Sequence, residues 1–242
     1  MPAKHICVLA NSVKNKNRCV AGFEIKQTSG GQTEWGSWIR PISPHDNGAV
    51  NFNERRLSNR HDNQEPQILD IIEISLKQHE VDPIQPENWL LDSTRSWKWI
   101  GTIPWREILA QAERPVDLWL ENRKFPERVS TGYLRRQTGV QSLYWIRPQK
   151  IHLEVHTEYN RAEGRNKRVR RVLFSYNWFN YDLPLTDPEI EAHYFPEFPN
   201  EKEGVRRIDL ASGNHCLMCV SCTPVFNGFH YKVVATILEL PE

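Results

Sequence analysis

Trp38-Ile39-Arg40-Pro41 and Trp145-Ile146-Arg147-Pro148 repeat the same four residues at two places in this chain. The copies lie roughly 100 residues apart, about the length of one small domain. Such self-similarity predicts a duplicated unit. Because side chains alternate between the faces of a strand, each copy would present its indole and its guanidinium on one face. The proline would end the strand or keep it at a sheet edge.

The composition is that of a packed protein of one large or two small domains. The chain has 242 residues, of which 39% are hydrophobic and 10% aromatic. No apolar run approaches the ~20 residues that span a bilayer, and the N-terminal apolar run is too short for a signal peptide. Five cysteines without framework spacing fit a reducing compartment. We therefore expect a soluble, cytoplasmic protein without membrane contact.

Short segments of alternating apolar and polar residues predict a mainly β protein with two β-barrels. Asn227-Gly228 predicts a tight hairpin turn. Asp187 as N-cap and Pro188 at the first helical position predict a helix start. We expect strands at 5–10, 18–26, 35–42 and 68–76 in the first half and at 143–147, 151–157, 168–177, 217–221 and 231–240 in the second.

The region between the halves has a different pattern. Pro104 precedes a short helical pattern, and 130–139 has the composition of a loop. We interpret this region as a partly helical connector. The expected domains are therefore 1–88, the connector 89–139, and 140–242. Within the first domain, the polar segment 43–65 is expected to be a long loop.

The formal net charge of +1 conceals two basic clusters. The first 23 residues contain no Asp or Glu but carry Lys14, Lys16 and Arg18 near the turn of the first expected hairpin. Such a turn could hold a phosphate, and the alternative is an ordinary solvated turn. The second cluster occupies another expected hairpin and contains Arg161, Arg165, Lys167, Arg168, Arg170 and Arg171. A turn this cationic repels itself unless water or an anion surrounds it, so we expect contact with a polyanion.

The two Trp-x-Arg pairs offer a second type of contact. Trp38 and Trp145 could stack on bases, while Arg40 and Arg147 could bind phosphate. The alternative is that both indoles belong to the core and each arginine pairs with a carboxylate.

Several segments, in their order along the chain, resemble the prokaryotic dual OB-containing domain family. They are residues 6–14, Arg18-Cys19-Val20-Ala21-Gly22, Trp38-Ile39-Arg40-Pro41, Leu183-Pro184-Leu185-Thr186-Asp187-Pro188, Cys219-Val220-Ser221 and residues 231–235. The resemblance covers nearly the whole chain. It implies two OB-like barrels and nucleic-acid binding in bacterial systems, including an accessory role in defence. It implies no catalytic residues.

We therefore predict a non-enzymatic protein that binds DNA or RNA, single strands in preference to duplexes, without a cofactor or metal. The predicted nucleic-acid contacts are Lys14, Lys16, Arg18, Trp38, Arg40, Trp145, Arg147, Arg161, Arg165, Lys167, Arg168 and Arg170. One alternative is a protein-interaction or scaffold subunit that docks a protein partner through barrel edges or the segment 89–105.

A third hypothesis is a metal-dependent hydrolase built on Glu154 and the neighbouring His152, His156 and Glu158, which share one face of an expected strand. Parallel side chains on one strand seldom converge on one ion, so a solvated strand face is the alternative. Glu24-Ile25-Lys26 has the Glu-x-Lys form of some nucleases, but no upstream carboxylate precedes it. Cys216, Cys219 and Cys222 have metal-site spacing, yet they alternate between strand faces, and we expect buried thiols.

Overall fold

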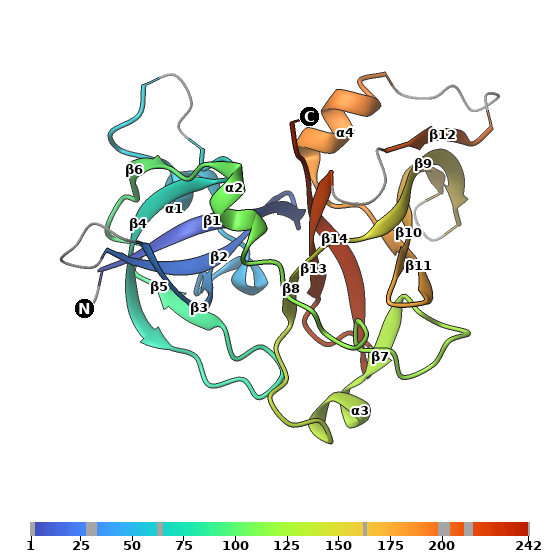
Figure 1. The fold of residues 1–242 in the computed structure, drawn as a ribbon, viewed down its shortest axis with the longest axis horizontal. Helices are drawn as coiled ribbons and strands as arrows, with labels where there is room; N and C mark the ends of the chain where they lie inside the picture. The colour runs from blue at the N-terminus through green and yellow to red at the C-terminus, as the bar shows by residue number, and fades with distance from the viewer. Residues whose placement is uncertain are drawn as a thin grey trace. The chain divides into compact units, whose positions relative to one another are not determined.

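The computed structural model describes residues 3–27, 33–61, 65–161, 164–197, 204–210 and 215–241. The chain forms two compact units, one of Met1–Gln111 with Gln137–Leu143 and the other of Ala112–Arg136 with Tyr144–Glu242. Both units consist mainly of strands (Figure 1). The predicted mainly β class is therefore confirmed.

The first unit is a closed five-stranded barrel. Its sheet has the order β1-β2-β3-β5-β4, and β4 pairs back with β1. All neighbours are antiparallel except β3 and β5, which run parallel. This is the strand order of an OB fold. The elements are β1 (Ala3–Lys14), β2 (Asn17–Gln27), β3 (Thr33–Ile42), η1 (Asp46–Gly48), α1 (Phe52–Arg55), β4 (Asp70–His79), β5 (Asn88–Leu91), β6 (Lys98–Thr102) and α2 (Trp105–Leu109).

Alternate residues of these strands fill the barrel. Ile6, Val8, Val20 and Ile39 belong to one buried cluster that also includes residues of β4 and β5. Burying each such side chain stabilises the fold by about 1.5–3 kcal/mol. At Gly22 a Cβ atom would lie 1.8 Å from the Cys7 carbonyl oxygen, so only glycine lets β1 and β2 approach this closely.

The second unit repeats this strand order with an interrupted first strand. Its sheets have the orders β11-β10-β9-β12 and β7-β14-β13-β8. A parallel bridge between Leu185 and Val234 joins the end of β11 to β14. Since β8 continues into β9 after a break at Arg147-Pro148, the order is again that of an OB barrel. The elements are β7 (Arg128–Ser130), α3 (Thr131–Arg135), β8 (Leu143–Ile146), β9 (Gln149–Asn160), β10 (Arg165–Tyr176), β11 (Phe179–Pro184), α4 (Pro188–Tyr194), β12 (Arg206–Asp209), β13 (Cys216–Cys222) and β14 (Phe229–Glu239).

The repeated tetrapeptide does not mark equivalent positions. Trp38–Arg40 lies on the third strand of the first barrel, whereas Trp145 lies on the first strand of the second. Pro148 ends β8 as expected, but Pro41 lies inside β3, beside β5. What repeats between the units is the strand order, so the predicted repeat of one unit is found, but the two tetrapeptides do not occupy equivalent positions in it.

The expected connector is divided between the units. Its first part contributes β5, β6 and α2 to the first unit, where β5 closes the barrel between β3 and β4. Its later part contributes β7 and α3 to the second unit. A strand as short as β5 (Asn88–Leu91) is too brief to show a period of two in the sequence. The segment 43–65, expected to be a loop, contains η1 and α1, and residues 62–64 lie outside the described residues.

Two local predictions are confirmed. Asp187 is the N-cap of α4, where its side chain accepts hydrogen bonds from the backbone of Glu189 and Ile190, and Pro188 begins the helix. Asn227 and Gly228 form the turn before β14, with φ angles of 50° and 79°. Both positions therefore adopt the left-handed conformation that this dipeptide favours.

Candidate nucleic-acid interface

The two predicted stacking indoles are buried. Trp38 is 6% exposed and packs at 4.4 Å against the ring of Phe23, and Trp145 is 0% exposed. The prediction that these rings face solvent is wrong, because a stacking surface needs an open ring face. Arg147, the arginine of the second Trp-x-Arg pair, is half-buried and lies at the break between β8 and β9.

Arg40 is a buried structural cation. Its Nη2 atom lies 2.8 Å from Glu87 and 2.9 Å from the Ser142 hydroxyl, and its Nε atom donates to Asn88 at 2.7 Å. Arg40 and Glu87 are each less than 5% exposed. A desolvated guanidinium needs this full set of acceptors. The prediction that Arg40 contacts phosphate is therefore wrong.

The basic residues of the first hairpin lie close together, but two of them are engaged within the unit. Lys14 donates to the Asn47 carbonyl oxygen at 2.7 Å, and burial lowers the pKa of its amine. The Nε atom of Arg18 lies 3.6 Å from Glu65. Lys16, in the two-residue turn with Asn15, is exposed. Two of the three cations expected at the turn of the first hairpin, Lys14 and Arg18, therefore already contact an acceptor within the unit.

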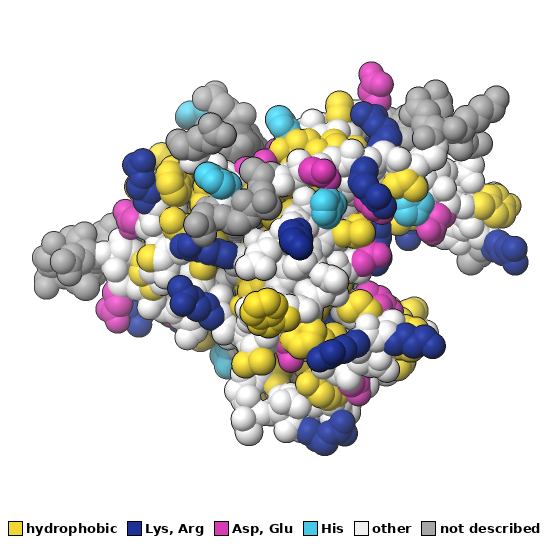
Figure 2. Space-filling view, turned by 45° about the vertical axis from the view of Figure 1, so that its right-hand side comes forward, with side chains coloured by type: hydrophobic (Ala, Val, Ile, Leu, Met, Phe, Trp, Pro, Cys, Tyr) yellow, Lys and Arg dark blue, Asp and Glu magenta, His cyan; other side chains and the backbone are white. Residues whose placement is uncertain are grey.

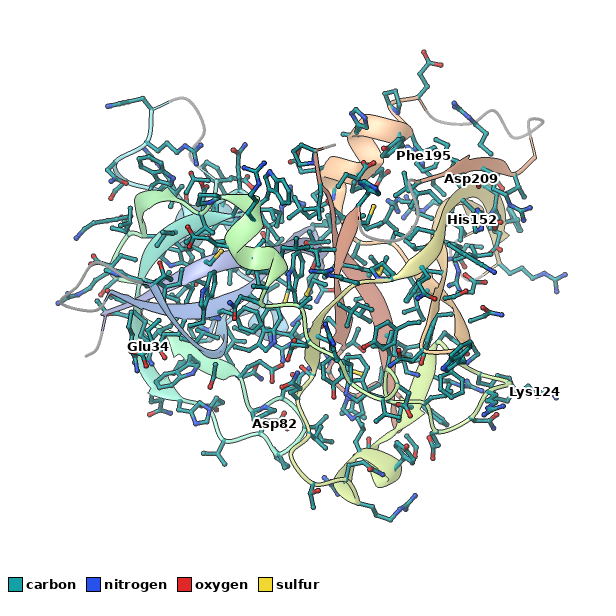
Figure 3. The ribbon with its side chains drawn as sticks, in the orientation of Figure 1. Glu34, Asp82, Lys124, His152, Phe195 and Asp209 are labelled. Atoms are coloured by element: carbon teal, nitrogen blue, oxygen red, sulfur yellow. The ribbon has the colours of Figure 1, made fainter. Side chains whose placement is uncertain are left out.

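The arginine-rich hairpin of β9 and β10 separates into two regions. Arg168 and Arg170 share the face of Val172, as predicted, and both pair with Glu191 of α4, at 3.3 and 2.6 Å. Arg168 also donates to the carbonyl oxygen of Phe195, which Figure 3 labels beyond α4. On the other face, Arg171 pairs with Asp182 at 2.7 Å. Two carboxylates of the same unit therefore pair with the three arginines at the base of the hairpin.

The end of the same hairpin is exposed. Arg161, Arg165 and Lys167 are exposed, and we call these three residues the hairpin tip. Tyr159 is 64% exposed and lies opposite Asn166 in the β9–β10 pairing. The structure therefore gathers cations and an aromatic ring at this end of β9 and β10, as single-strand binding requires.

Two further exposed arginines were not expected. Arg206 and Arg207 lie on β12, which pairs with β9, and Arg206 shares the face of Val155 and therefore of Tyr159. Arg207 donates to Glu154. In the sequence, the adjacent pair Arg206-Arg207 was the only sign of this cationic position. The strand that carries the pair, β12, has only four residues and was therefore not recognised. Tyr159 could have been found from its position beside the cationic turn.

The strand face proposed for a hydrolase carries paired side chains. His152, Glu154, His156 and Glu158 do share one face of β9, but His152 contacts Asp209, His156 lies 2.9 Å from Glu158, and Glu154 is bound by Arg207. Figure 3 labels His152 and Asp209 on adjacent strands. Within the described part of the chain, no group of three or more His, Cys, Asp and Glu side chains is placed to hold a metal ion.

The Glu-x-Lys segment and the three cysteines of β13 have structural surroundings that explain them. Glu24 of the Glu-x-Lys segment pairs with Lys4 at 2.8 Å. Cys216, Cys219 and Cys222 are buried in β13. Of the helices that the structure describes, none combines the length and apolar character needed to cross a membrane.

These observations define the class of the protein. A closed barrel of order β1-β2-β3-β5-β4, followed by a unit of the same order, makes it a protein of two OB folds. The chain belongs to the dual OB-containing domain family, whose model matches residues 4–237. The family resemblance seen in the sequence is thereby confirmed. No curated protein and no solved structure matches the chain.

Proposed function

We propose that the protein binds single-stranded nucleic acid and that the hairpin tip is the main phosphate contact. The observation that carries this proposal is the separation of charge along β10. Arg168, Arg170 and Arg171 are half-buried and pair with carboxylates, whereas Arg161, Arg165 and Lys167 are exposed to solvent. An exposed cluster of like charge is destabilising by itself, and a polyanion relieves that repulsion.

Tyr159 makes a single strand the better ligand. A base can stack on an exposed aromatic ring only where it is not already stacked in a duplex, and one such contact contributes roughly 1–3 kcal/mol. Arg206 on the neighbouring strand shares the face of Tyr159 and supplies a further cation. Stacking of this kind does not distinguish DNA from RNA.

The proposal is tested by fluorescence anisotropy with labelled single- and double-stranded DNA and RNA at two salt concentrations. The wild-type protein should bind single strands more tightly than duplexes, and the triple variant R161S/R165S/K167S should bind them more weakly. The matched control, K26S/R56S/K77S, removes three exposed cations of the first unit and should bind like wild type. Equal losses in both variants would reduce the proposal to nonspecific charge attraction, and no binding by wild type would reject it.

The finer predictions are part of this proposal. The protein acts without catalysis, since Glu154 is held by Arg207 and a strand face of paired residues offers no open ligand position. Cleavage of labelled nucleic acid that needs a divalent ion and disappears in Glu154→Gln would contradict this. An accessory role in bacterial defence rests on the family resemblance, and a scaffold role is the alternative if wild type binds no nucleic acid.

A further inference from the structure

One tryptophan of the second unit occupies a position that packing does not explain. Asn177 and Trp178 form the two-residue turn between β10 and β11, with φ angles of 44° and 70°. Glycine is preferred at the second position of such a turn, because left-handed backbone is strained for a bulky residue. The Trp178 side chain is nevertheless 100% exposed, so it gains no burial in exchange. Strain that persists without a packing gain points to a function for the side chain.

The segment that precedes β7 lies against this turn. Asn177 and the Tyr176 hydroxyl both donate to the carbonyl oxygen of Pro115, at 2.8 and 3.0 Å. Further along the segment, the Arg123 guanidinium lies 5.0 Å from the ring centre of Phe179, the residue after Trp178. The backbone at the turn is therefore anchored, and a cation stands over the neighbouring ring.

A second aromatic and cationic group lies at the start of β14. The Arg128 guanidinium lies 4.6 Å from the ring of Phe125 and 4.8 Å from that of Phe229. Glu127 is 3.7 Å from Arg128, a distance that leaves the guanidinium only weakly paired. Phe125 is 37% exposed. A guanidinium this close to two rings places positive charge beside flat apolar surface.

The parallel pairing of β11 and β14 brings these two groups to one end of the second unit. Phe179 is the first residue of β11 and Phe229 the first of β14, and the strands run in the same direction at Leu185 and Val234. Lys124, which Figure 3 labels, lies between Arg123 and Phe125 on the segment that precedes β7. We call these residues the aromatic end of the second unit and define it by Arg123, Phe125, Arg128, Trp178, Phe179 and Phe229. Figure 2 shows that hydrophobic side chains and Lys and Arg side chains lie next to one another on the visible face of the molecule.

We propose that the aromatic end is a second binding site for the same nucleic-acid strand, in which bases stack on Trp178 and Phe125 while Arg123 and Arg128 contact phosphates. This inference rests on the proposed function of the hairpin tip. The combination of exposed rings and cations is complementary to a strand that carries both bases and phosphates. A purely apolar protein partner would leave these cations unmatched.

The two surfaces define a length for the ligand. The hairpin tip lies at the start of β10 and the aromatic end at its finish, because β10 and β11 are antiparallel and meet at the Trp178 turn. β10 has 12 residues, which span about 40 Å at roughly 3.3 Å per residue. A stacked strand covers that distance with about 12 nucleotides at 3.4 Å each, within the range of roughly 4–16 found for OB folds.

Trp178→Gly is the sharpest variant, because glycine suits the backbone of this turn. It should bind a fluorescein-labelled oligo(dT) 15-mer about 5- to 150-fold more weakly than wild type, the loss of one stacked base. Phe125→Ala should act in the same direction. The melting temperature of Trp178→Gly should equal or exceed that of wild type. The matched control is Phe52→Ala, which removes an exposed ring of the first unit, 5.6 Å from Arg55, and should leave binding unchanged.

Oligonucleotide length separates this inference from the proposed function. Wild type should prefer the 15-mer to a 6-mer, and Trp178→Gly should lose most of that preference. If wild type binds the 15-mer and both aromatic variants bind it equally well, the aromatic end is not a nucleic-acid site, while the hairpin tip stands. If wild type binds neither oligonucleotide, the proposed function itself fails and a protein becomes the occupant of the exposed rings.

Discussion

The two units share a strand order but use their cations in different ways. In the first unit, Lys14 and Arg18 of the hairpin between the first two strands have acceptors in Asn47 and Glu65. In the corresponding hairpin of the second unit, the acceptors Glu191 and Asp182 reach only the base, and the hairpin tip stays exposed. The difference indicates that the placement of neighbouring acids, rather than the composition of the turn, decides whether a basic turn stays exposed to a ligand.

The buried cations differ in the same way. Arg40 of the first unit has three polar partners. Lys232 of the second unit is 0% exposed, and its Nζ atom has no hydrogen-bond partner among the described residues. Burial lowers the pKa of Lys232 to about 8. The buried cation of the first unit therefore has hydrogen-bonded partners, whereas the amine of the buried lysine in the second unit has none among the described residues.

Arg40→Ala should have the largest effect on stability. It leaves Glu87 buried without its cation, which costs about 3–5 kcal/mol. Urea unfolding measures the loss, and Lys26→Ala, an exposed control in the same unit, should change the free energy of unfolding by less than about 0.5 kcal/mol. A loss below about 1 kcal/mol for Arg40→Ala would contradict the structural role of this arginine.

Lys232 should make stability depend on pH in the alkaline range. Between its folded pKa of about 8 and its ordinary value of 10.5, the unfolded chain binds more protons than the folded chain. The free energy of unfolding therefore rises with pH, by up to about 1.4 kcal/mol per unit, and the penalty is complete below pH 8.

Lys232→Met isolates this effect. The variant should be more stable than wild type at pH 7, and the difference should shrink as the pH approaches 10. Chemical denaturation at several pH values measures both curves. Parallel curves for wild type and variant would show that Lys232 has the same pKa in the folded and unfolded chain, and would contradict this account.

Glu191→Gln should have a smaller effect and should extend the binding surface. The carboxylate pairs with both Arg168 and Arg170, and its removal leaves Arg170 able to contact phosphate. The dependence of log affinity on log salt should steepen by about 0.7 for each phosphate gained. Stability should change by less than about 1 kcal/mol, because these ion pairs are partly exposed. An unchanged salt dependence would place the base of the hairpin outside the path of the strand.

Periodicity predicted much of the fold from the sequence. The strands β1 to β4, β8 to β10, β13 and β14, the Asn227-Gly228 turn, the Asp187 cap and the placement of Arg168 and Arg170 on the face opposite Arg171 all follow from local alternation and turn chemistry. The strands β5, β6, β7, β11 and β12 were not predicted, because segments of three to six residues carry little pattern.

The site was predictable only in part, because burial and ion pairing depend on segments distant in sequence. Nothing local distinguishes the buried Trp145 from the fully exposed Trp178. Arg40 is withdrawn from the surface by Glu87 and Ser142, far along the chain. The aromatic end forms only because β11 and β14 run parallel, so no contiguous stretch of sequence predicts it.

The central claim is that the second hairpin, and not the first, holds the nucleic acid. The most direct measurement is the salt dependence of single-strand affinity for wild type, R161S/R165S/K167S and K14S/K16S/R18S. The slope of log affinity against log salt should fall by about 2 for the second-hairpin variant, at roughly 0.7 per phosphate. It should fall by no more than about 0.7 for the first-hairpin variant, since of those three cations only Lys16 is exposed. Equal reductions, or a larger one at the first hairpin, would contradict the account.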